Sequence, residues 1–145
     1  MASSRISSAD SARLADLAED TVIMAKAGTI KGFRDADRRF HLAVAAATDN
    51  RGLLAGVEQA LLLTAALAEN AVFASQDVMI RCAQEHGRIA ILIARMDPDE
   101  AAAAMAAHVD ALAADALDSL DSPASLGSVE GRHGSDGGAE VRVDR

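Results

Sequence analysis

The chain has 145 residues and a formal net charge of −8, because 22 acidic side chains outnumber 14 basic ones. This length suits one domain with one core, and the acidic balance argues against direct binding to DNA. Cys82 is the single cysteine, which excludes an internal disulfide. Because no apolar run approaches the roughly 20 residues of a membrane span and no signal peptide is evident, we expect a cytoplasmic protein without membrane contact.

The composition favours helices over sheet. Half of the residues are hydrophobic, yet aromatic residues make up only 2% of the chain. Alanine, which supplies much of the apolar half, is the best helix former, whereas strands prefer β-branched and aromatic residues. We therefore expect an all-α fold.

Apolar periodicity predicts five helices, at about residues 9–27, 31–48, 53–73, 76–96 and 97–120. Gly28 is placed to end the first helix, and the polar run 49–52 predicts a turn. The third helix is apolar over much of its circumference, so we expect it to be the central and most buried element.

The fourth and fifth helices each carry a histidine on their inward stripe. In the fourth, Met79, Cys82, His86, Ile89, Ile93 and Met96 recur with steps of three and four. Asp97 and Pro98 are typical of a helix start, and the fifth helix then aligns Ala101, Met105, His108 and Leu112.

The last part of the chain changes character. Residues 121–145 hold five of the ten glycines and show no apolar periodicity, which predicts a disordered tail after a domain at 9–120. His133 lies in this tail, so we assign it to no site.

Four residues form a candidate metal site. Asp37 and His41 are four positions apart and share one helix face, while His86 and His108 occupy core-facing stripes of two other helices. A buried imidazole is costly unless something satisfies it. A lone inward histidine is more often a packed core residue, and Asp37 beside two arginines is compatible with a surface ion pair. Three of the four histidines in the chain fall on inward positions, and this coincidence favours a shared metal site over separate core residues.

The same residues carry a family resemblance. Residues 37–50, from Asp37-Arg38-Arg39-Phe40-His41 to Asn50, resemble the D-x-x-F-H…A-x-x-N signature of the FCD domain. The FCD domain is the effector-binding half of FadR-type GntR transcription regulators. Glu85-His86 with Ile89, Asp97-Pro98 and the run from Ala101 to His108 resemble the E-H-x-x-I…D-P…A…M-x-x-H pattern that follows there.

This resemblance implies an antiparallel bundle of about five helices in which Asp37, His41, His86 and His108 hold a divalent metal ion. Imidazole and carboxylate donors suit zinc, the ion we expect first, as well as nickel, manganese and iron. One carboxylate and three neutral imidazoles leave the ion with a net charge of +1 and open positions. A small organic acid would bind there as the effector.

Two departures from the family pattern shape our expectations. We find no winged-helix DNA-binding domain, and the chain resembles the effector domain from its second helix onward, without the helix whose arginine faces the ligand. Arg34, Arg38 and Arg81 are conceivable substitutes, although a solvated role fits each. The missing helix would leave an apolar groove, which we expect a second subunit to cover in a homodimer.

Two other functions remain open. A three-histidine, one-carboxylate ion also activates water in hydrolases, with Glu85 as the nearest base. Glu85 points about 100° away from His86 around the helix, which argues against this role. The third reading is a metal-free helical interaction module in which the histidines merely pack.

Overall fold

The computed structural model describes residues 6–67 and 75–121, with the backbone alone for residues 64–67 and 119–121. These residues form five α-helices and no strand, which confirms the expected all-α fold. The helices are α1 (Ser8–Ala27), α2 (Ile30–Ala46), α3 (Arg51–Leu67), α4 (Gln76–Ala94) and α5 (Pro98–Asp121). Within the described ranges no helix is both long and apolar enough to cross a membrane.

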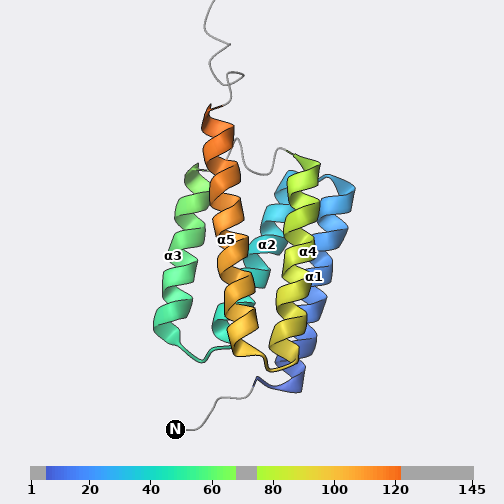
Figure 1. Ribbon diagram of the computed structural model, residues 1–145, viewed down its shortest axis with the longest axis vertical. Coiled ribbons are helices and arrows are strands. Elements are labelled where there is room, and N and C mark those ends of the chain that lie inside the picture. The colour runs from blue at the N-terminus through green and yellow to red at the C-terminus, as the bar shows by residue number, and fades with distance from the viewer. Residues whose placement is uncertain (1–5, 68–74, 122–145) are drawn as a thin grey trace, which may run out of the picture.

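The helices pack in an order that differs from their order in the chain. α1 lies against both α2 and α4, α5 packs on α4, and α3 packs on α2 (Figure 1). The order in space is therefore α3, α2, α1, α4, α5. This row is curled, because side chains of α2 and α5 meet directly in the interior.

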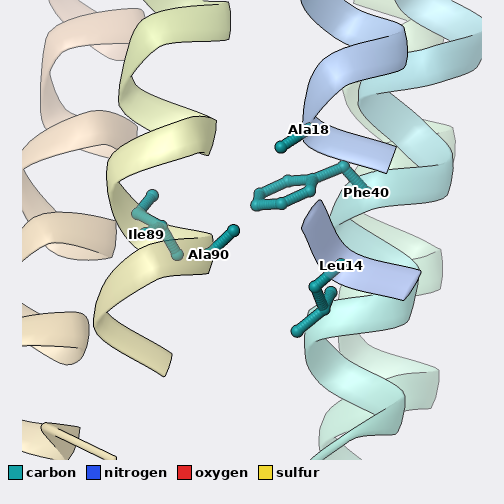
Figure 2. Packing of buried hydrophobic residues seen from close by; sticks show 5 residues of the cluster. All are labelled: Leu14, Ala18, Phe40, Ile89 and Ala90. Carbon is teal, nitrogen blue, oxygen red and sulfur yellow. The ribbon is translucent and has the colours of Figure 1, made fainter. Parts of the chain in front are cut away.

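The core has a polar layer between two apolar clusters. One cluster is formed by Leu14, Ala18, Phe40, Ile89 and Ala90, and Figure 2 shows Phe40 of α2 lying beside Ala18 of α1 and facing α4. The other is formed by Ala25, Phe33, Met79, Cys82 and Ala83. Buried Thr21, Asp37 and His86 lie between these clusters in the sequences of α1, α2 and α4.

Local capping explains where α1, α3 and α5 start and where α1 ends. The Ser7 hydroxyl accepts from the Asp10 amide at 3.0 Å, and the Asn50 side chain accepts from the Leu53 amide at 3.0 Å. The Asp97 carboxylate accepts from the Glu100 amide at 3.3 Å, as the sequence predicted. Gly28 ends α1 in the left-handed conformation with φ 67°.

The prediction that the third helix is the most buried element is wrong. Over residues 51–63, α3 has no buried side chain, and Leu63 is 65% exposed. Its principal neighbour is α2 alone. An apolar circumference shows that a helix could be surrounded by neighbours, but it does not show that the chain provides them.

Met96 is also misplaced in the prediction. α4 ends at Ala94, and Met96 lies in the turn to α5 with φ 58° and 51% of its surface exposed. The chain reverses direction between Met96 and the cap at Asp97, so the helical spacing of three and four residues does not apply to Met96. The predicted residues 68–73 of the third helix and the tail from residue 122 lie outside the described residues.

The left-handed glycine supports a test of the fold. Gly28→Ala should lower the free energy of unfolding by about 1–2 kcal/mol, because a Cβ is strained at this φ. A Cβ at this position would meet only the Gln76 side chain, at an ordinary 3.5 Å, so backbone strain is the cause.

Gly56→Ala in the middle of α3 is the matched control. Nothing lies within 4 Å of its added Cβ, so this change should raise the free energy of unfolding by about 0.5–1 kcal/mol. Urea denaturation measures both. Equal effects of the two substitutions would contradict the assigned end of α1.

Candidate metal centre

Three helices bring the four predicted residues together in the bundle interior. α2 carries Asp37 and His41 one turn apart, α4 carries His86, and α5 carries His108. The side chains of His86 and His108 have no exposed surface, while those of Asp37 and His41 are 11% and 13% exposed. One donor atom from each residue lies within 4.8 Å of all the others.

These donor atoms form a closed ring. Asp37 Oδ1 lies 3.5 Å from His41 Nε2 and 3.4 Å from His86 Nε2. His108 Nε2 lies 3.4 Å from His41 Nε2 and 3.3 Å from His86 Nε2. Donors about 2.0–2.2 Å from one ion are about 2.8–3.6 Å apart when they subtend angles from 90° to tetrahedral. The ring therefore has the dimensions of a coordination sphere.

A hydroxyl sets the tautomer of His86. Thr21 of α1 donates its hydroxyl proton to the Ala18 carbonyl oxygen at 2.6 Å, and its Oγ1 lies 3.3 Å from His86 Nδ1. Since the single hydroxyl proton is already used, Thr21 accepts from His86, and the imidazole carries its proton on Nδ1. The lone pair on Nε2 then points into the ring.

A carboxylate has the same effect on His108. Glu85 Oε2 lies 2.7 Å from His108 Nδ1, and an ionised carboxylate can only accept. Nδ1 of His108 is therefore the protonated nitrogen. Glu85 was considered above as the base of a hydrolase, but it contacts the edge of His108 that faces away from the ring, so it is not positioned to activate water there.

These two tautomers leave a buried electrostatic conflict. His86 Nε2 and His108 Nε2 lie 3.3 Å apart, and each neutral imidazole presents a lone pair to the other. Buried polar atoms need partners, and two neutral imidazoles in these tautomers cannot donate to each other, so a proton or a metal ion has to lie between the two nitrogens. A cation between them removes the conflict, so the donor set fits a metal ion.

Burial and charge favour the protonation states that metal ligands need. Burial lowers the pKa of His86 to about 3, which keeps this imidazole neutral. Burial raises the pKa of the Asp37 carboxyl, but the hydrogen bond to His41 and the electrostatic attraction of the three histidine rings together outweigh it, so the pKa is lowered overall. A neutral imidazole and an ionised carboxylate are the ligating forms.

Phe40 and Cys82 were not assigned to the site from the sequence, but both contact its donor residues. Phe40 stacks on His86 with 4.3 Å between ring centroids, which fixes the plane of the imidazole. The Cys82 sulfur lies 3.8 Å from Asp37 Oδ1 and 3.7 Å from His86 Nε2. Burial raises the pKa of this thiol and the Asp37 charge raises it further, so Cys82 donates to Asp37 as a protonated group.

The three arginines considered as effector contacts have different surroundings. Arg38 lies 3.9 Å from Glu58 of α3, and both side chains are about half exposed. Arg81 pairs with Asp115 of α5 and lies 3.7 Å from Glu85. Arg34 is half-buried on α2. Neither the Arg38 contact nor the Arg81 contacts place a guanidinium in the ring of donor atoms.

The family assignment follows from comparison with known proteins. The FCD domain family matches residues 1–111, so the chain belongs to the FCD domain family. FCD domains are regulatory, effector-binding domains of GntR-family transcription regulators rather than catalytic ones. Comparison with curated proteins and with solved structures found no match.

The lowered pKa of His86 predicts how acid affects the ion-free protein. The unfolded chain protonates His86 near pH 6.5, whereas the folded chain does so only near pH 3. The unfolded state therefore binds more protons between these values, so stability falls as the pH falls through this window. One such group contributes a slope of up to about 1.4 kcal/mol per pH unit.

Urea unfolding at several pH values, with a chelator present, measures this slope. His86→Leu should show a shallower slope between pH 6.5 and the onset of carboxylate titration, because it removes this group and keeps the others. Equal slopes for both proteins would contradict a neutral, buried His86.

Proposed function

We propose that this FCD domain senses a small organic acid through a divalent metal ion that is bound by Asp37, His41, His86 and His108. The observation that carries the proposal is the 3.3 Å contact between His86 Nε2 and His108 Nε2, where the assigned tautomers present lone pairs that a cation satisfies. The donors are three imidazoles and one carboxylate, so zinc is our first choice, with nickel, manganese and iron as the other candidates.

The charge of the site supports an acidic effector. One ionised Asp and three neutral imidazoles leave a divalent ion with a net charge of +1. A carboxylate that binds at a free coordination position would offset this charge. Since Asp37 and His41 are the ligand side chains with measurable exposure, the effector would approach the ion on their side.

A groove on the protein lies outside this site. It has a volume of about 770 Å³, runs between α1, α2 and α3, and includes none of the four ligands. Apolar Leu14, Leu42 and Leu54 line it together with charged residues such as Arg13 and Glu58. We do not assign the effector to this groove, because it lacks the donor atoms that define the site. The expected homodimer stays a prediction, which sedimentation equilibrium addresses.

Metal content tests the proposed ligands. Protein purified without a histidine tag should contain one divalent ion per chain, and His86→Ala should lose it. The melting temperature should fall with the ion, since an ion that binds only the folded state stabilises that state. His133→Ala, which removes the fourth histidine, is the matched control and should keep the ion.

Elemental analysis before and after chelation gives the result. An ion-free wild-type protein would favour the metal-free interaction module, with a proton in place of the ion between His86 and His108. An unchanged ion content in His86→Ala would remove His86 from the site.

Effector binding is tested separately with citrate, a small tricarboxylate. Citrate should raise the melting temperature of the metal-loaded protein and leave that of the chelated protein unchanged, because it binds through the ion. Equal shifts in both forms would mean that the acid binds elsewhere. Hydrolysis of ester or phosphoester substrates by the loaded protein would favour the hydrolase instead.

A further inference from the structure

A line of four alternating charged and polar side chains runs along the seam between α4 and α5. His108 and Asp115 are seven positions apart on α5, and Glu85 and Arg81 are four positions apart on α4. Glu85 bonds His108 at 2.7 Å, Arg81 Nε lies 3.7 Å from the other Glu85 oxygen, and Arg81 also pairs with Asp115. We call these four residues the α4–α5 ladder.

We propose that Glu85 is a positioning residue of the ion site and that Arg81 acts behind it, so that the α4–α5 ladder sets how well His108 binds the ion. This inference rests on the metal site proposed above and assigns roles to two residues outside its ligands. Glu85 holds the His108 proton on Nδ1, which leaves the Nε2 lone pair for the ion. Arg81 Nε lies within ion-pair distance of the other Glu85 oxygen without a hydrogen bond to it, so the guanidinium acts on the carboxylate through charge.

The exposure of the first three members of the ladder supports this direction of action. The His108 side chain is fully buried, Glu85 is 31% exposed, and Arg81 is 42% exposed. The bond between Glu85 and His108 is short and partly shielded from water, as expected of a charge-assisted hydrogen bond. Arg81 is the most exposed member of the ladder, whereas Asp115 is 25% exposed, so the contribution of Arg81 should be smaller than that of Glu85.

The ladder also compensates for sparse packing. α5 packs principally on α4, whereas α2 and α5 are not among the principal packed pairs of helices. His108 nevertheless has to reach His41 of α2. Because α5 is anchored mainly on one side, the His108 ring needs a second contact, at Nδ1, to keep its orientation. Glu85 provides that contact.

The first experiment reads the tautomer of His108 in the ion-free protein by nitrogen-15 NMR of the imidazole rings. Chelated wild-type protein should show His108 protonated on Nδ1. Glu85→Ala should lose this preference, and Glu85→Gln should keep part of it, because the amide oxygen still accepts. His108 protonated on Nε2 in the wild-type protein would overturn the proposal, whether or not the protein binds a metal.

The second experiment measures zinc affinity by competition with a chelator of known strength. Glu85→Ala should weaken binding by about 10–100-fold while keeping one site per chain, as loss of an outer partner of a ligating histidine does. Glu85→Gln should lose less, and Arg81→Met less than Glu85→Ala. Gln84→Ala, an exposed neighbour on α4, is the matched control and should bind as the wild type does.

The two experiments separate the possible failures. If wild-type protein binds no zinc, the proposed function fails, and the tautomer spectrum still decides the role of Glu85. If wild-type protein binds zinc and Glu85→Ala binds it equally well, the positioning role is wrong while the metal site stands. The near-isosteric Glu85→Gln covers the case in which Glu85→Ala does not fold.

Discussion

The contact between His86 Nε2 and His108 Nε2 is the constraint on which the account of this protein depends. Thr21 and Glu85 each take the Nδ1 proton of one imidazole, which turns both Nε2 lone pairs toward each other at 3.3 Å. In a buried position that arrangement is unfavourable without a cation. The tautomers argue for an ion more strongly than the residue types do, because packed histidines would normally pair donor with acceptor.

The fold places this contact in the middle of the bundle. Side chains, rather than helix packing, connect α5 to α2 there. Apolar clusters above and below the polar layer keep water away from α1, α2 and α4. α5 joins principally through α4, so a shared ion would add a link from α5 to α2 that helix packing provides only weakly. Ion binding and the docking of α5 should therefore support each other, as in other domains where metal binding contributes folding energy.

Much of this arrangement was predictable because it depends on short-range rules. The spacing of Asp37 and His41 fixes a common helix face, and the inward stripes of α4 and α5 place His86 and His108 in the interior. The predicted helix end at Gly28 and helix start at Asp97 are likewise local and agree with the structure. The neighbours of α3 depend on how the whole chain packs, which explains why its predicted burial was wrong.

The residues that contact the four predicted metal ligands could be identified only from the structure. Thr21 lies on the buried face of α1, but periodicity does not say that α1 packs beside α4. Glu85 does point away from His86 around α4, as predicted, yet that direction leads to His108 of α5 rather than to solvent. Cys82 shares the inward stripe with His86, and only its contact with Asp37 shows that the thiol is a hydrogen-bond donor there.

X-ray absorption spectroscopy of the zinc-loaded protein tests the central claim most directly, because it reports the atoms around the ion. The account predicts a first shell of nitrogen and oxygen alone at about 2.0–2.2 Å, with outer-shell scattering from three imidazoles. A sulfur neighbour at about 2.3 Å would assign Cys82 as a ligand, and a shell without imidazole scattering would place the zinc elsewhere. Either result would contradict the coordination of one ion by Asp37, His41, His86 and His108.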